Sequence, residues 1–152
     1  MAFPFPLQEL LTRVYRAYTV EFEHALAEAG HPDLSLALGT NIVRFLDGEG
    51  RRLGSIAELA GVSKQAISQQ VAYLEAKGYV VLSPDPDDSR AKLVHLTELG
   101  RQSQAVARPL FRAIERRWAQ RFGQDEMQQL RAALETVVGR LEGSEQPTHD
   151  EL

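Results

Sequence analysis

Residues 56–74 read IAELAGVSKQAISQQVAYL, and this stretch predicts the fold of the chain. Ala57 is small enough for two short helices to approach closely. Gly61 stands four residues later, where a tight turn needs a residue that tolerates positive φ. Ile67 then begins the apolar face of a second helix, and this face continues four and seven residues later. Two short helices that meet at a tight turn in this way are typical of a helix-turn-helix.

The opposite face of the second helix is polar, compact and free of acidic residues. Ser63 is expected to cap this helix at its N-terminus. Glutamine can pair bidentately with adenine in the major groove, lysine can reach guanine or phosphate, and serine makes short adaptable contacts. The alternative is a solvated polar face on a small helical domain. The candidate DNA-contacting residues are Ser63, Lys64, Gln65, Ser68 and Gln69.

The hydrophobic periodicity changes after this helix. Residues 79–82 and 93–96 are short apolar runs rich in strand-forming residues, and residues 83–91 between them are dense in turn formers. We predict two strands joined by a long turn, that is, a β-hairpin. A helix-turn-helix followed directly by a hairpin is the winged arrangement, in which the hairpin lies along the DNA backbone or reaches the minor groove.

The charges of this predicted wing are mixed. Asp85, Asp87 and Asp88 would repel phosphate if all three faced it. Arg90 lies late in the turn, where Asp88 can hold it for insertion between the DNA backbones. Asp88 and Arg90 are therefore added to the candidate DNA site. The alternative is a turn whose acids are simply solvated.

Amphipathic stretches on both sides of this core predict further helices. Ser55 and Glu58 have capping-box spacing at the start of the first helix of the motif. Thr97 can cap a long helix in which Pro109 removes a backbone donor, so we expect a bend there. The polar tail from Gly143 is expected to be disordered. The second helix of the motif is predicted to run from the Ser63 cap to about Lys77, and the other predicted helices are residues 7–29, 34–46, 55–60, 97–122 and 124–141.

Length and composition describe an ordinary single domain. The chain has 152 residues, of which 43% are hydrophobic and 25% are charged. No run approaches the roughly 18 apolar residues of a membrane span, so no membrane partner is expected. The N-terminus has no signal-peptide pattern, and the absence of cysteine excludes disulfides and thiolate metal sites. These features are compatible with a cytoplasmic protein.

The stretch 55–101 resembles the MarR family of winged helix-turn-helix transcription regulators. The matching segments are ELA at 58–60, VSKQ at 62–65, LEAKGYV at 74–80, SPDPDDSR at 83–90 and LTELGR at 96–101. The flanking helices match in order and length. One departure is Leu82, because family members often carry an arginine just before the Ser-Pro-Asp of the wing. This departure removes a potential backbone contact or wing-bracing salt bridge.

The resemblance implies a mainly α (α+β) fold, a winged helix-turn-helix with flanking dimerisation helices. Residues 34–96 would form the DNA-binding lobe, residues 1–30 and 97–142 the dimerisation helices, and residues 143–152 a flexible tail. The wide apolar faces of the flanking helices also favour a homodimer. Two recognition helices would then lie about 34–36 Å apart and read a pseudo-palindromic operator in double-stranded DNA.

The resemblance further implies repression that is relieved by a small aromatic or phenolic effector bound between the dimerisation helices and the winged lobe. Residues that can line such a crevice are Tyr15, Tyr18, Phe22, His31 and Trp118, although each also suits a core position. A metal-responsive variant would use His24, His31 and Asp33, for which helix capping and surface imidazoles are the simpler explanation. His95 is expected on the exposed face of a strand.

Other function classes have less support. The chain has no glycine-rich phosphate loop, nucleophile elbow or His-Glu-x-x-His motif, so we predict no enzyme activity and no cofactor. A winged fold that binds a protein partner remains an alternative, because of Leu82 and the acids of the wing.

The net charge of −4 taken alone argues against nucleic acid as a partner, but its distribution does not. Residues 51–96 hold six basic and five acidic side chains, and residues 97–123 hold six and two. Most of the acid therefore lies near the two ends of the chain. A lobe that is only weakly basic predicts salt-sensitive binding through few, well-placed cations.

Overall fold

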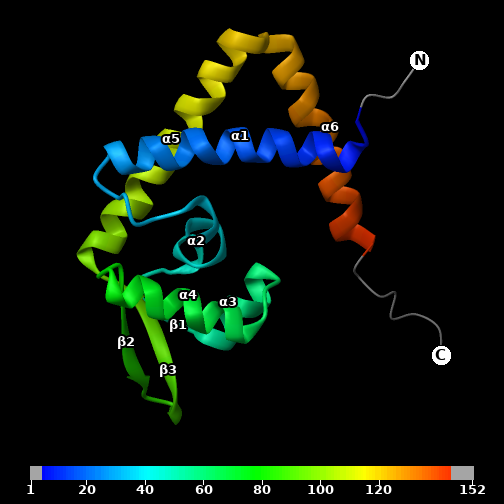
Figure 1. Ribbon diagram of the computed structural model, residues 1–152. Helices are drawn as coiled ribbons and strands as arrows, with labels where there is room; N and C mark the ends of the chain where they lie inside the picture. Colours follow the sequence, from blue (N-terminus) through cyan, green and yellow to red (C-terminus); the bar gives the residue numbers. More distant parts are fainter. Residues whose placement is uncertain (1–4, 145–152) are drawn as a thin grey trace, which may run out of the picture. The chain divides into compact units, whose positions relative to one another are not determined.

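The computed structural model describes residues 5–144, with the side chain of Ser144 left aside, and divides into two compact units. The first unit ends at Phe111 and the second begins at Arg112. The first contains α1 (Leu7–Glu28), α2 (Leu36–Asn41), η1 (Val43–Phe45), β1 (Arg51–Arg52), α3 (Leu53–Ala60), α4 (Lys64–Ala76), β2 (Val80–Asp85) and β3 (Asp88–Leu96) (Figure 1). Helix α5 (Glu98–Phe122) runs from the first unit into the second, which also contains α6 (Gln124–Ser144).

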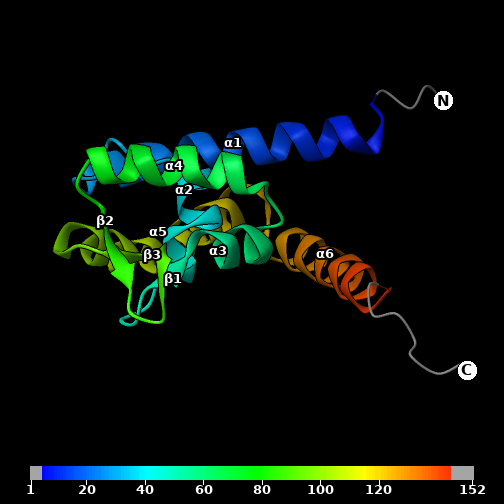
Figure 2. The same cartoon turned by 90° about the horizontal axis from the view of Figure 1, so that it is seen from below.

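Helices α3 and α4 form the predicted helix-turn-helix. Gly61 has φ +65° at the turn, and the N–H of Val62 donates to the carbonyl of Ala57 at 3.1 Å. Ile56 and Ile67 are completely buried between these helices and their neighbours. Helix α3 packs against α2 and α4, and the three helices are grouped beside the hairpin in Figure 2. The tight turn and the buried apolar face are therefore as the sequence predicted.

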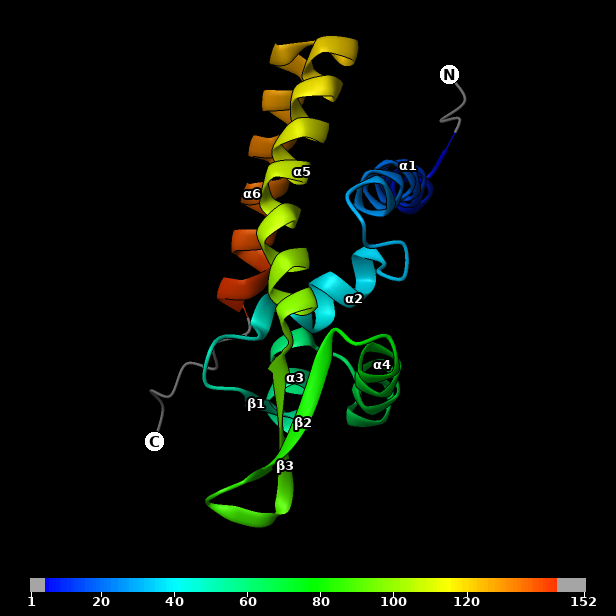
Figure 3. The same ribbon diagram turned by 90° about the vertical axis from the view of Figure 1, so that its left-hand side faces the viewer.

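The sheet has the strand order β1-β3-β2, with all neighbours antiparallel. Val80 lies opposite Leu96, and Pro84 lies opposite Lys92. The hairpin of β2 and β3 projects beyond α3 and α4 (Figure 3). The predicted long turn over residues 83–91 was wrong, because most of that segment is strand and only Pro86 and Asp87 lie between the two strands. Pro84 is compatible with a strand here because β2 is at the edge of the sheet.

Two helix boundaries differ from the predictions. The predicted helix over residues 34–46 is divided into α2 and η1, because Ile42 leaves the helical region at φ −129° and ψ −64°. The predicted capping box at Ser55 was also wrong. Helix α3 begins at Leu53, and Arg52 occupies the N-cap position with no side-chain cap. The reason is that Arg51 and Arg52 pair with β3 as β1, so the chain passes directly from strand to helix.

The second unit is built from the C-terminal part of α5 and from α6. Arg131 on α6 bonds Glu115 on α5 at 2.8 Å, and the rings of Trp118 and Phe122 meet edge to face. Gly123, at φ +109°, separates the two helices. Helix α6 continues to Ser144, so the first two residues of the predicted tail are helical, and the rest of that tail lies outside the described residues.

Two further expectations concern the long helices. Pro109 lies inside α5, and the bend expected there stays a prediction. Across residues 5–144, none of the helices is long and apolar enough to cross a bilayer.

Candidate nucleic-acid interface

The polar face of α4 is presented to solvent. Lys64, Gln65 and Gln69 are exposed, and Ser68 is half-buried. The first turn of α4 contains no acidic residue. Ser63 accepts the N–H of Ala66 at 3.2 Å through its hydroxyl oxygen, as predicted for an N-cap. The five predicted residues are therefore together along one helix, with amide, ammonium and hydroxyl groups available for base edges and phosphates.

The buried side of α4 fixes this helix to the rest of the first unit. Ile67, Val71 and Leu74 are buried, and the hydroxyl of Tyr73 donates to the carbonyl of Asp33 at 2.8 Å. The side-chain amide of Asn41 donates to that of Gln70 at 3.3 Å. These contacts attach α4 to the first unit through one side of the helix. The polar groups on the opposite side are not needed for this attachment and face solvent.

The wing presents Arg90 differently from the prediction. Asp88 accepts the backbone N–H of Arg90 at 3.0 Å, so the carboxylate holds the main chain rather than the guanidinium. Both side chains are exposed on β3. Within residues 5–144 the guanidinium of Arg90 forms no ion pair, which leaves its donors available for a phosphate or a groove.

A second arginine near the wing was not predicted from the sequence. Arg52 on β1 donates through Nε to Oδ2 of Asp85 at 2.5 Å. Asp85 is only 6% exposed, and its other oxygen accepts the N–H of Asp87 at 2.9 Å. The Asp87 N–H, and then Arg52, lower the pKa of the Asp85 carboxyl, while burial opposes that shift. One of the three wing acids is therefore paired and withdrawn from solvent.

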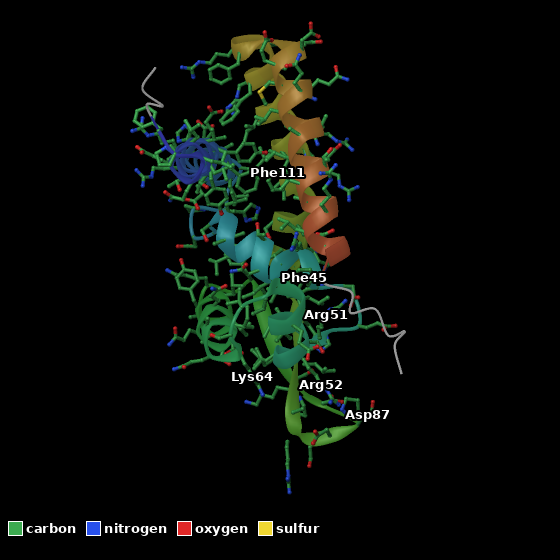
Figure 4. All side chains as sticks on the ribbon, turned by 90° about the vertical axis from the view of Figure 1, so that its right-hand side faces the viewer. Phe45, Arg51, Arg52, Lys64, Asp87 and Phe111 are labelled. Atoms are coloured by element: carbon green, nitrogen blue, oxygen red, sulfur yellow. The ribbon has the colours of Figure 1, made fainter. Side chains whose placement is uncertain are left out.

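The side-chain view places these groups at one end of the first unit. Lys64 at the start of α4, Arg52 on β1 and Asp87 between the strands of the hairpin all lie on its lower side in Figure 4.

The sequence signal that could have identified Arg52 is weak. Arg52 lies 33 residues before Asp85, and no local pattern connects the two residues.

His95 was predicted to lie on an exposed strand face, and this prediction was wrong. His95 instead contacts neighbouring residues at the base of the wing. The imidazole of His95 is half-buried and lies 2.9 Å from the hydroxyl of Ser83 through Nε2. Gly50, at φ +80°, lies so close that a Cβ atom there would overlap the imidazole ring of His95. His95 is covered because the sheet has an additional strand, β1, that the sequence did not predict. The loop that leads into β1 places Gly50 against the His95 ring.

The predicted effector residues do not form one cluster in the first unit. Phe22 is buried and stacks on Phe111 with ring centroids 4.5 Å apart, and Tyr18 stacks on the same ring at 6.3 Å. His31 is 4% exposed and lies 3.2 Å from the hydroxyl of Tyr79 through Nδ1. Tyr15 is 57% exposed. Trp118 lies in the second unit, and the role of all five residues in effector binding stays a prediction.

The first unit contains an open cavity of about 510 Å³ beside α4. None of the five predicted effector residues lines it. Its lining comes from α1, the segment before α2, α2 itself and α4, and consists of Glu23, Pro32, Asp33, Leu34, Ser35, Leu38, Gln69, Gln70 and Tyr73.

The predicted metal-ligand candidates have other partners. His24 lies 3.4 Å from Glu28, and Asp33 pairs with Lys77 at 3.4 Å. The part of the chain that the structure describes contains no group of three or more residues able to hold a metal ion.

Comparisons with known proteins agree with this geometry. The sequence model of the MarR family matches residues 40–91. The chain is similar to FabT of Streptococcus pneumoniae in complex with DNA, with a TM-score of 0.72, 19% identity, and 91% of this chain and 97% of that chain covered. The comparison with curated proteins found no match.

Two structures of CouR are also similar. The transcriptional repressor CouR bound to a 23-mer DNA duplex has a TM-score of 0.71 and 27% identity, with 88% of this chain and 92% of that chain covered. CouR from Rhodococcus jostii RHA1 bound to p-coumaroyl-CoA has a TM-score of 0.65 and 26% identity, with 90% and 94% covered. The predicted family resemblance and the predicted winged helix-turn-helix fold are confirmed.

Proposed function

We propose that this MarR-family winged-helix regulator, which acts on DNA, is a cytoplasmic homodimeric repressor that binds a pseudo-palindromic operator. The observation that supports it is the exposed polar face of α4, whose first turn contains no acidic residue, together with a hairpin whose Arg90 is exposed and not ion-paired within residues 5–144. Gln65 and Gln69 would read base edges in the major groove, and Lys64 and Arg90 would contact phosphates or a groove. The residues proposed for DNA binding remain those predicted from the sequence.

Exposed apolar side chains in each unit support the proposed dimer. In the first unit they lie along α1 and include Leu7, Leu10, Leu11, Val14, Tyr15 and Val20. In the second unit they lie along α6 and include Leu130, Leu134, Val137, Val138 and Leu141. Contiguous apolar surface of this kind marks a protein interface. We therefore assign residues 1–30 and 97–142 to dimerisation and residues 34–96 to the DNA-binding lobe.

Release from the operator is proposed to follow binding of an aromatic or phenolic effector. Tyr18 and Phe111, which are half-buried and stack on each other, supply aromatic surface in the first unit, and the buried ring of Phe22 supports them. One similar protein, CouR, has been solved with p-coumaroyl-CoA. The test is to titrate the protein–DNA complex with p-coumaroyl-CoA and a panel of phenolic acids. Failure of every compound to release DNA would contradict this effector class.

The DNA-binding proposal is tested by titrating the protein into labelled DNA from the region upstream of its own gene. We expect a specific complex whose affinity falls steeply as salt rises. No complex with folded dimer at low salt would overturn the proposal. Sedimentation of the free protein measures the dimer directly, and a reporter gene under the same promoter distinguishes repression from activation.

The contribution of the wing is tested by Arg90→Ala. If Arg90 meets phosphate or a groove, the variant weakens binding to all sequences and reduces the salt slope by about one. Arg44→Ala is the matched control, because Arg44 is also exposed but belongs to η1, outside α4 and the hairpin, and its guanidinium lies over the Phe45 ring. An unchanged salt slope in Arg90→Ala would remove that residue from the proposed interface.

A further inference from the structure

We propose that Arg52 is a positioning residue for the wing, which acts through Asp85 to fix the turn that presents Arg90 to DNA. This inference rests on the proposed function, because it concerns how the wing meets DNA. It adds a residue from outside both the recognition helix and the hairpin.

The ion pair connects two strands that are not neighbours in the sheet. Arg52 lies opposite Leu93 in the register of β1 and β3, whereas Asp85 is the last residue of β2 on the other side of β3. The contact between Arg52 Nε and Asp85 Oδ2 therefore passes across the middle strand. The effect is to fix the tip of the edge strand β2 to the start of α3, since Arg52 is also the N-cap residue of that helix.

Asp85 passes this restraint on to the turn. Its carboxylate accepts the N–H of Asp87 while it is bonded to Arg52. Asp85 also lies opposite Asp88 in the register, where the ladder shifts between Pro84 and Asp85. Asp88 in turn accepts the N–H of Arg90. A short series of contacts therefore runs from Arg52 to Arg90, the residue that we propose contacts phosphates or a groove of the DNA.

The electrostatics explain why an arginine is needed at this place. Asp85 is buried, and a buried carboxylate that loses its charged partner and keeps only the Asp87 N–H is unfavourable. Without Arg52, the carboxylate would have to move toward solvent, and the turn that depends on it would lose its geometry. The same pairing also neutralises one of the negative charges that the hairpin would bring near phosphates.

A direct phosphate contact by Arg52 is the competing explanation, because its side chain is 47% exposed. The two roles predict different coupling with Arg90. A positioning residue makes the effect of Arg90 depend on its presence, whereas two independent phosphate contacts contribute additively. The test is therefore a double-mutant cycle in DNA affinity with Arg52→Ala, Arg90→Ala and the double variant.

We expect Arg52→Ala and Arg90→Ala each to weaken operator binding by about 10-fold or more, as for loss of a charge-assisted contact. In the Arg52→Ala background, removal of Arg90 should cost less than about 3-fold. Arg52→Lys keeps the cation opposite Asp85 and should restore most of the affinity. Additive losses, or no loss in Arg52→Ala, would overturn the positioning role.

Arg51→Ala is the matched control on the same short strand. This substitution also removes one cation and one ion pair. The partners of Arg51, however, are the carbonyl of Phe45 and the carboxylate of Asp47, which lie outside the wing. We expect its effect on affinity to add to that of Arg90→Ala. Equal coupling in both cycles would attribute the effect to general loss of charge and would overturn the assignment to Arg52.

Hydrogen exchange of the free proteins gives a measurement that needs no DNA. Arg52→Ala should increase exchange at the backbone N–H groups of Asp87 and Arg90, while α4 stays as protected as in Arg51→Ala. Unchanged protection of the turn would overturn the proposal. If the wild-type protein binds no DNA, the proposed function fails and the role of Arg52 in DNA binding fails with it. If the wild-type protein binds and only the coupling is missing, the proposed function stands and this inference alone fails.

Discussion

The recognition helix and the wing lie at the same end of the first unit, but they are held there by different kinds of contact. Helix α4 is defined by neighbouring residues: Ser63 caps it, and Ile67 begins its buried face. The wing depends on residues distant in sequence, because Arg52 binds Asp85 and Gly50 makes room for His95. A locally determined element tolerates changes elsewhere in the chain, whereas the wing can be disturbed from β1 without a change in the hairpin itself.

A substitution in the core that α4 and the wing share should destabilise both regions equally. Ile67 is completely buried in the helix-turn-helix, and Ile67→Ala should lower the free energy of unfolding by about 2–5 kcal/mol. Both α4 and the wing should then lose protection together. Leu59→Ala on α3 is the control, because Leu59 is about half exposed and its truncation should cost far less. Urea unfolding measures both variants, and equal costs would contradict the assignment of Ile67 to the core.

A change beside the wing base should separate the two regions. Gly50→Ala places a Cβ against the His95 ring at a position with φ +80°, so it should destabilise the protein by about 1–3 kcal/mol. Hydrogen exchange should increase mainly in β1 and β3 and leave α4 protected. The control is Gly48→Ala, because a Cβ at Gly48 meets no atom within 4 Å. Loss of protection that is largest in α4 would show that the two regions are not independent.

The accuracy of the sequence predictions follows the same division. The turn at Gly61, the cap at Ser63 and the buried face of α4 were predictable because each depends on spacing within one or two turns of helix. The wing was predicted to exist, but its strands were underestimated, since Pro84 and Asp85 are turn formers that pairing with β3 holds in a strand. The pairing of β1 with β3, and the contacts of Arg52 and His95, join segments that no local pattern connects.

Base reading by α4 should be separable from stability. Gln65 is exposed on α4, so Gln65→Ala should leave the free energy of unfolding unchanged within about 0.5 kcal/mol. If Gln65 pairs with adenine, the variant should lose about 1–3 kcal/mol of discrimination at one base pair in each half-site. Selection of bound sequences from random DNA measures this preference. An unchanged preference would assign Gln65 to the solvated polar face instead.

The smallest expected effect is the change in protein stability that accompanies the titration of Asp85 in acid. Its pKa lies below the ordinary value of 3.8 in the folded protein, chiefly because of the Asp87 N–H and Arg52. The ionised carboxylate therefore stabilises the fold above pH 3.8, and this contribution is lost as the pH falls from 3.8 through the lower pKa of the folded state. Arg52 stays charged throughout, because a guanidinium is protonated at acidic and neutral pH, and Asp85 raises its pKa further.

Urea unfolding of the wild-type protein and of Asp85→Asn measures this contribution. The difference in unfolding free energy should be constant between about pH 5 and pH 7 and should shrink below pH 3.8. Asp87→Asn removes a charge from the same turn and corrects for the change in net charge. If the Asp85→Asn difference stays constant into strong acid, the carboxylate is not stabilised by its contacts in the fold, and the wing would then be held by backbone pairing between β2 and β3 alone.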